Sequence, residues 1–112
     1  MSPRDVVDRF GTAWAEHDLE SVLSMLTDDC VFDATGPAPD GMRCVGHDAI
    51  RAAWKPIFDD PSSVFEVEQT IEAGDHIIGL WRYSWADGHI RGVDVFLVRD
   101  GLVAEKLSYV KG

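Results

Sequence analysis

The first half of the chain has apolar residues at helical spacing. Apolar side chains recur every three or four positions behind Pro3, which predicts an amphipathic helix over residues 3–16. Asp18 is a suitable cap for a second short helix, whose apolar positions extend to Leu26. A third helix is expected to begin at Gly46, since an acidic residue and an apolar face follow it. Pro56 is expected to kink or end this helix.

The second half has the alternating pattern of strands. The four predicted strands cover residues 64–73, 76–85, 90–99 and 102–110. Tight turns join them, and two of these turns contain the Asp-Gly pair that is typical of hairpins, so we predict an antiparallel meander. A further short strand is expected at Cys30–Asp33. Helices followed by a sheet indicate a single α+β domain over residues 1–112.

Composition and motifs exclude several classes of protein. The net charge is −10, from 20 acidic and 10 basic residues, so neither nucleic acid nor a membrane is an expected partner. No apolar run is long enough to cross a membrane, and we expect a cytoplasmic protein with free thiols at Cys30 and Cys44. The histidines lack metal-ligand spacing and there is no nucleotide-binding glycine motif. The sequence therefore predicts no metal and no cofactor.

Three segments of the chain resemble a known superfamily. They are W-A-E-H-D-L-E-S-V-L-S-M-L-T-D-D-C-V-F, V-G-H-D-A-I-R-A-A-W and R-G-V-D-V-F-L-V-R-D-G-L-V-A-E-K. With these segments the chain is similar to the nuclear transport factor 2-like superfamily, and within it to the SnoaL-like proteins, which are polyketide cyclase relatives, and to the ketosteroid isomerases. The resemblance implies a cone-shaped, curved antiparallel sheet wrapped around three N-terminal helices, with a pocket at the wide end. It also implies a homodimer formed through the outer face of the sheet.

Asp94 is a carboxylic acid in the middle of an otherwise strand-forming run. The period of two places Asp94 and Phe96 on one face of the sheet. Asp94 matches the position where ketosteroid isomerases carry a pocket acid that hydrogen-bonds the substrate oxygen, so the resemblance implies acid–base chemistry there. An apolar cavity would favour the neutral form of the carboxyl group. The alternatives are a buried water network and a structural ion pair with Arg91, Arg82 or Lys106.

Two other positions differ from the isomerases that the chain resembles. Phe10 stands where the isomerases have an oxyanion-binding tyrosine, and Ala34 stands where they have the catalytic base. Asp33 lies one residue away, and a shift of one residue in a strand turns a side chain to the opposite face. Ketosteroid isomerase activity is therefore not expected.

The predicted pocket has an aromatic wall with a few polar groups. The candidate ligand-contacting residues, from strand parity and from the resemblance, are Phe10, Trp14, Trp54, Phe58, Trp81, Tyr83, Trp85, Phe96, Lys106 and Ser108. Such a wall favours a small apolar or aromatic ligand.

Three hypotheses about function remain open at this point. The protein could be an isomerase, cyclase or dehydratase-type enzyme that uses Asp94, a non-catalytic binding or dimerisation module, or a scaffold whose pocket is filled by its own tryptophans. An enzyme requires at least two polar groups that converge on one point of the cavity.

Overall fold

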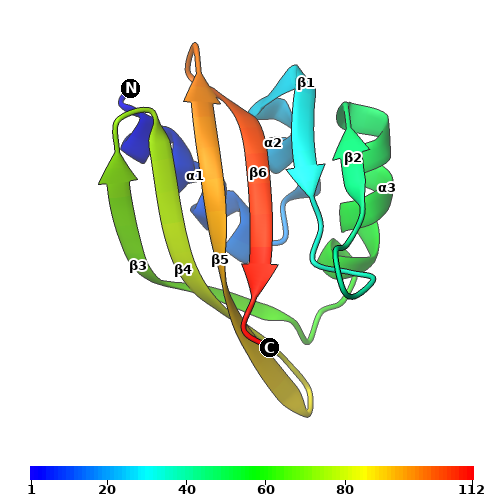
Figure 1. The fold of residues 1–112 in the computed structure, drawn as a ribbon. Coiled ribbons are helices and arrows are strands. Elements are labelled where there is room, and N and C mark those ends of the chain that lie inside the picture. Colours follow the sequence, from blue (N-terminus) through cyan, green and yellow to red (C-terminus); the bar gives the residue numbers. More distant parts are fainter.

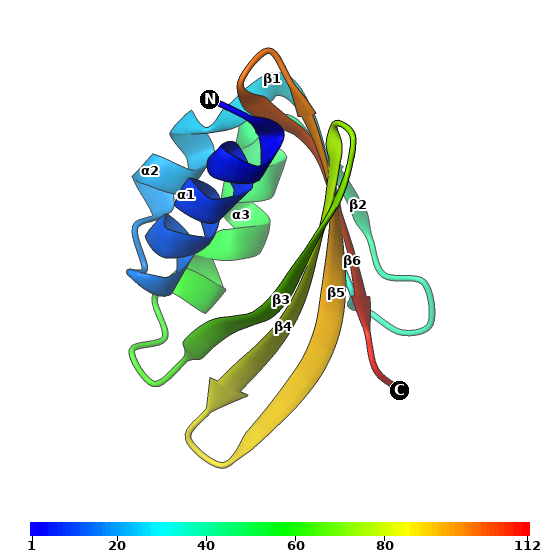
Figure 2. The same cartoon turned by 90° about the vertical axis from the view of Figure 1, so that its left-hand side faces the viewer.

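Six strands form one curved sheet, and three helices cover its concave inner face, in the computed structural model of residues 1–112 (Figure 1 and Figure 2). The helices are α1 (Pro3–Ala15), α2 (Leu19–Ser24) and α3 (His47–Phe58). The strands are β1 (Leu26–Asp33), β2 (Arg43–Val45), β3 (Val64–Ala73), β4 (His76–Trp85), β5 (Gly88–Arg99) and β6 (Leu102–Val110). None of the helices is long and apolar enough to span a membrane.

The order of strands across the sheet is β2-β1-β6-β5-β4-β3. Every neighbouring pair is antiparallel except β1 and β6, which run parallel. The predicted meander from β3 to β6 is therefore confirmed, and the parallel pair joins it to the first half of the chain. The predicted α+β fold of three helices and a curved sheet is confirmed as well, with a sheet that is mixed rather than wholly antiparallel.

Local signals begin the first two helices. The Ser2 hydroxyl accepts a hydrogen bond from the backbone N–H of Asp5 at 3.1 Å, and the Asp5 carboxylate accepts one from the Ser2 N–H at 3.2 Å. The Asp18 carboxylate accepts a hydrogen bond from the backbone N–H of Ser21 at 3.1 Å. The helix predicted over residues 3–16 and the cap at Asp18 are confirmed, within one residue at the end of α1.

The chain between α2 and α3 differs from the prediction. Leu26, expected on the second helix, begins β1, and the predicted strand at Cys30–Asp33 is only the second half of β1. Leu26 pairs with Val103 of β6, whose backbone N–H donates to the Met25 carbonyl at 2.8 Å. The strand β2 was not predicted at all, and it exists because it pairs with β1. Both differences come from long-range pairing, which local periodicity does not contain.

Of the two predicted effects of Pro56, a kink or an end of the helix, the end is wrong, because α3 continues to Phe58. The proline lies in the last turn of the helix, where the missing N–H removes only one hydrogen bond. Ile50, Trp54 and Phe58 are all buried along one side of α3, and their packing holds the last turn against the core.

The core lies between the helices and the inner face of the sheet. The Trp54 side chain is fully buried, and its ring lies 4.9 Å from Trp14 and 5.2 Å from Phe32, measured between centroids. Phe10 connects α1 to β5 through an edge contact with Phe96 at 5.5 Å. These aromatic contacts fix α3 against β1 and α1 against β5, the strand that carries Asp94.

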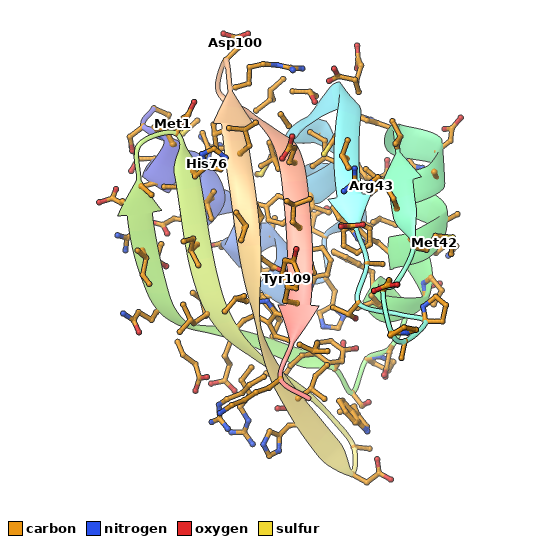
Figure 3. All side chains as sticks on the ribbon, viewed as in Figure 1. Met1, Met42, Arg43, His76, Asp100 and Tyr109 are labelled. Carbon is orange, nitrogen blue, oxygen red and sulfur yellow. The ribbon has the colours of Figure 1, made fainter.

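The outer face of the sheet carries an aliphatic patch of half-buried side chains, which we call the outer-face patch. It consists of Ile78, Leu80, Val93, Val95, Leu97 and Leu107. Figure 3 looks onto this face, with Tyr109 on it and the helices behind the sheet. No element of the chain covers the patch.

Candidate functional site

Asp94 lies on the inner face of β5, and only 2% of the residue is exposed. Its direct neighbours across the sheet are Gly79 of β4 and Ser108 of β6. Gly79 has no side chain, so one flank of the carboxyl group is open. Ser108 fills the other flank with a hydroxyl group.

Asp94 and Lys106 form a buried ion pair with Ser108 between them. The Ser108 hydroxyl donates to Asp94 Oδ1 at 2.6 Å, and Lys106 Nζ donates to Ser108 Oγ at 3.1 Å. Lys106 Nζ lies 3.5 Å from Asp94 Oδ2, and 7% and 3% of the two side chains are exposed. Arg91 instead pairs with Glu68 at the surface, at 2.9 Å. Of the predicted ionic partners of Asp94, Lys106 is thus the one in contact.

Three aromatic rings surround the Lys106 ammonium group. The distance from Nζ to the ring centroid is 4.8 Å for Phe32, 4.9 Å for Trp14 and 5.6 Å for Trp54. The faces of aromatic rings attract a cation, so these contacts hold the ammonium group in place beside Asp94. An ammonium group has three N–H donors, and Ser108 Oγ is its one hydrogen-bond acceptor within the protein. The remaining donors are available to an oxygen atom of a ligand.

A cavity of about 430 Å³, which we call the mouth cavity, reaches the ion pair from the side of α3 and the segment between β1 and β2. It is lined by Trp14, Phe32, Ala34, Thr35, Gly36, Met42, Cys44, Ala53, Ile57, Phe65, Trp81, Tyr83, Ile90, Asp94, Lys106 and Ser108. Its wall is mostly apolar, and the ion pair with Ser108 supplies the charged and polar end.

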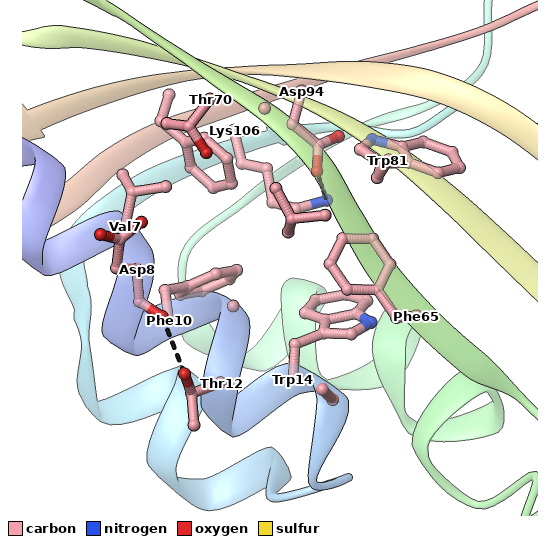
Figure 4. Close-up of a pocket in the computed structure, with 15 residues that line it drawn as sticks. Val7, Asp8, Phe10, Thr12, Trp14, Phe65, Thr70, Trp81, Asp94 and Lys106 are labelled. Atoms are coloured by element: carbon pink, nitrogen blue, oxygen red, sulfur yellow. Dashed lines mark hydrogen bonds and ion pairs between the residues drawn. The ribbon is translucent and has the colours of Figure 1, made fainter.

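A second cavity of about 350 Å³, which we call the slot cavity, reaches the same ion pair between α1 and β3 (Figure 4). It is lined by Val7, Asp8, Phe10, Gly11, Thr12, Trp14, Ala15, Phe65, Val67, Thr70, Gly79, Trp81, Asp94, Phe96 and Lys106. Five residues line both cavities, namely Trp14, Phe65, Trp81, Asp94 and Lys106. The ion pair therefore belongs to the walls of both cavities.

The family model described as SnoaL-like domain matches residues 7–106. The chain belongs to the SnoaL-like domain family. Among curated proteins, none matches the chain significantly.

Solved structures of other proteins have the same fold as this SnoaL-like domain. An NTF2-like protein of unknown function from Mesorhizobium loti is 37% identical, with a TM-score of 0.89 over 98% of this chain and 91% of that one. A provisionally assigned ketosteroid isomerase from Kribbella flavida is 15% identical, with a TM-score of 0.84 over 98% of this chain and 78% of that one. A computationally designed 17-OHP binder is 24% identical, with a TM-score of 0.82 over 99% of this chain and 92% of that one. The latter two likenesses concern the fold alone.

The two cavities of the SnoaL-like domain bring together most of the predicted site residues. Phe10 and Phe96 line the slot cavity, Tyr83 and Ser108 line the mouth cavity, and Trp14, Trp81, Asp94 and Lys106 line both. Three predicted contact residues line neither cavity, namely Trp54, Phe58 and Trp85. The first two are buried in the core, because successive turns of α3 direct them between α1 and the sheet. Trp85 is 37% exposed, because β4 extends beyond the helices at that end.

Some lining residues were not among the predicted contacts. Phe65 lies on the inner face of β3 and lines both cavities, but a bulge after Val67 interrupts the alternation of that strand. Ala34 lines the mouth cavity, whereas Asp33 lies in neither wall and pairs with Arg43 at 3.3 Å. The one-residue difference between positions 33 and 34 thus separates a cavity position from a surface ion pair.

The two cysteines have different surroundings on the inner side of the sheet. Cys44 lines the mouth cavity, whereas Cys30 is fully buried in the core. Burial raises the pKa of the Cys30 thiol to about 12. No group of three or more His, Cys, Asp or Glu side chains is placed to hold a metal ion. Asp94 and Lys106 are the charged groups that line both cavities, and the Ser108 hydroxyl is hydrogen-bonded to both.

Proposed function

We propose that this SnoaL-like domain binds a small apolar carbonyl compound and catalyses proton transfer at the carbon next to its carbonyl group. Asp94 is the general base and Lys106 stabilises the oxygen that becomes negative. The observation that carries the proposal is the convergence of a carboxylate and an ammonium group on one point in the wall of two aromatic-lined cavities. Isomerisation, cyclisation and dehydration can all begin with this step.

The proton transfer requires a carboxylate with one free oxygen atom. Ser108 donates to Oδ1 of Asp94, which leaves Oδ2 with only the 3.5 Å ion pair to Lys106. In the proposed step, Oδ2 takes the proton from the carbon, and the electron pair of the C–H bond moves into the carbonyl group to form an enolate. In this proposal Asp94 acts as a base that is paired with Lys106, and not as the neutral hydrogen-bond donor of the alternative model.

Lys106 supports the proposal because its ammonium group can stabilise the negative oxygen of the enolate. A fixed ammonium group within a largely water-free wall stabilises a developing oxyanion more strongly than water does. The rings of Phe32, Trp14 and Trp54 hold the ammonium group in place through cation–π contacts. These contacts are not hydrogen bonds to an oxygen atom, so the N–H donors can still bind one. A ligand oxygen beside Ser108 would complete its hydrogen bonds.

A non-catalytic ligand-binding module is the second candidate function. It is favoured by the hydrogen bonds that Asp94, Ser108 and Lys106 already make with one another, since such a network is also a stable structural unit. The designed 17-OHP binder has the same fold, and this likeness supports a ligand-binding role for the cavities of the present protein. The scaffold hypothesis is the least supported, because the mouth cavity remains beside the packed Trp14 and Trp54.

Hydrogen–deuterium exchange of a simple ketone tests the proposal without knowledge of the natural ligand. Methyl phenethyl ketone is incubated with the protein in heavy water, and proton NMR follows the loss of the signals next to the carbonyl group. The expected result is exchange catalysed by the wild type and reduced about 100-fold or more in Asp94→Asn. Asp94→Glu, which keeps the charge, should retain part of the rate.

The result also separates the two candidate functions. Binding is followed independently, through protection of Cys44 from a thiol reagent. Protection without catalysed exchange would favour the binding module. Neither protection nor exchange, with this ketone and with larger planar ketones, would contradict both candidates.

We also propose that the protein is a homodimer formed through the outer-face patch. A two-fold interface buries the same patch on both copies, and such interfaces are rich in aliphatic side chains. The proposal rests on the size and continuity of the patch across β4, β5 and β6.

A further inference from the structure

We propose that the ligand of this domain carries its carbonyl group in the middle of its length, with one apolar arm in the mouth cavity and a second arm in the slot cavity. The inference rests on the proposed function, and it narrows the ligand class to internal ketones with apolar groups on both sides. A terminal aldehyde or a methyl ketone would fill only one cavity.

The ion pair is accessible from both cavities. Asp94 and Lys106 belong to the walls of the mouth cavity and of the slot cavity, together with Trp14, Phe65 and Trp81. A pocket with one opening would place its polar groups at the closed end, where they would meet the end of a ligand. Here the polar groups belong to the walls of both cavities, so a ligand with one arm in each cavity would place the group between its arms beside them.

The slot cavity exists because a glycine lies at the point where α1 faces β3. Gly11 is in the interior of α1, where glycine is about 1 kcal/mol less favourable than alanine. A Cβ atom built on Gly11 would meet only Val67 Cγ2, at an ordinary contact distance of 3.7 Å. Packing therefore does not require this glycine. Val67 is 48% exposed although it lies on the inner face, because no side chain of α1 covers it.

A second glycine widens the slot cavity beside the carboxylate. Gly79 of β4 lies between Asp94 of β5 and Thr70 of β3 in the sheet. All three residues line the slot cavity. A Cβ atom on Gly79 would approach the Phe96 ring at 3.8 Å, and it would be added to a wall position of the slot cavity. The space next to the carboxylate on this side is thus preserved by the backbone itself. Figure 4 shows Thr70 and the ion pair across the slot cavity from Phe10 and Trp14.

Each cavity is large enough for an aromatic arm. The slot cavity, of about 350 Å³, exceeds the ~150 Å³ of an engineered apolar cavity that holds benzene. Its inner wall is built mainly from Phe10, Trp14, Phe65 and Phe96, so an apolar arm fits its chemistry. Its polar groups near α1, Asp8 and Thr12, lie where water is accessible.

Two matched ketones test the inference. Diphenethyl ketone has a phenethyl arm on each side of the carbonyl group, and methyl phenethyl ketone has one such arm and a methyl group. Dissociation constants are measured by quenching of tryptophan fluorescence in the wild type, Gly11→Leu and Gly11→Ala. Leucine would extend from α1 towards Val67 and fill the slot cavity, whereas alanine restores helix propensity and leaves the cavity open.

We expect the wild type to bind diphenethyl ketone at least about tenfold more tightly than methyl phenethyl ketone, because the second arm buries additional apolar surface. Gly11→Leu should remove this advantage, because it weakens the binding of diphenethyl ketone more than the binding of methyl phenethyl ketone, while Gly11→Ala should keep the advantage. Equal affinity of the wild type for both ketones, or equal weakening of both by Gly11→Leu, would overturn the inference and leave the proposed function standing. If neither ketone binds, the proposed function fails and the inference fails with it.

Discussion

The two faces of β5 and β6 differ in which kind of side chain is buried and which is exposed. On the inner face, Asp94 and Lys106 form an ion pair that is almost completely buried, and Ser108 is hydrogen-bonded to both. On the outer face, Val95 and Leu107 pair with each other and remain half exposed. The usual distribution, with apolar groups inside and charges outside, is inverted at these positions.

The inversion shows where the fold tolerates a cost in stability. A buried ion pair is weak evidence for stability, because desolvation of the two charges offsets their attraction. An exposed aliphatic patch likewise gains little until another surface covers it. A ligand at the ion pair and a partner on the patch would each offset this cost, which is why the site and the interface are proposed at these positions.

Removal of one charge from the inner face should have the largest effect. Lys106→Met leaves the buried Asp94 carboxylate without a partner and is expected to lower the free energy of unfolding by about 3–5 kcal/mol. Glu105→Met, on the outer face of the same strand, should change it by no more than about 0.5 kcal/mol. Urea denaturation of the two variants measures both values.

A double variant sharpens this first prediction. Asp94→Leu combined with Lys106→Met replaces both charges by apolar groups, so much of the lost stability should return. A loss in Lys106→Met below about 1 kcal/mol would show that the ion pair is well solvated.

A charge placed in the outer-face patch should break the proposed homodimer. Val95→Glu puts an unpaired carboxylate at the centre of the proposed interface on both copies. The dissociation constant of the dimer should therefore rise about 100-fold or more. Leu102→Glu, at the turn outside the patch, serves as the control. Light scattering during gel filtration gives the mass of each variant. A wild type that is monomeric at high concentration would contradict the dimer.

A methyl group added to the inner face of the sheet should distinguish Gly92 of β5 from Gly79 of β4. A Cβ atom on Gly92 would lie 2.7 Å from the Trp81 ring and would also strike the Tyr109 carbonyl oxygen, so Gly92→Ala should cost about 1–3 kcal/mol. Gly79→Ala, with its nearest contact at 3.8 Å, should be tolerated. Thermal unfolding and the near-ultraviolet tryptophan signal measure the difference. Equal stability of both variants would mean that Trp81 moves freely.

The smallest expected effect is a difference in thiol reactivity between Cys44, in the wall of the mouth cavity, and Cys30, in the buried core. Thiol reagents attack the thiolate, and with a pKa of about 12 the Cys30 thiol stays protonated at pH values below that range. Cys44 lines the mouth cavity, so at mildly alkaline pH it should be labelled at least about tenfold faster than Cys30 in the native protein. Mass spectrometry after digestion gives both rates, and unfolded protein, in which both thiols react, is the control. Labelling of Cys30 at the rate of Cys44 would contradict the closed core.

A large part of the fold was predictable from local pattern. The helix at residues 3–16, the cap at Asp18 and the four strands of the meander rest on periodicity and turn chemistry, which act within a few residues. The start of β1 at Leu26 and the existence of β2 rest on pairing with distant strands, so no local pattern revealed them.

For the site, the amino-acid sequence alone determined which side chains share a face. The period of two placed Asp94 with Phe96 and Lys106 with Ser108, since alternation along a strand is a property of the backbone. Only the tertiary structure decided what these residues meet. Strand register set Ser108 beside Asp94, and the packing of α1 and α3 closed three rings around Lys106 while Gly11 left a second cavity open. These contacts join residues that are far apart along the chain, and they depend on distances that no spacing within one segment contains.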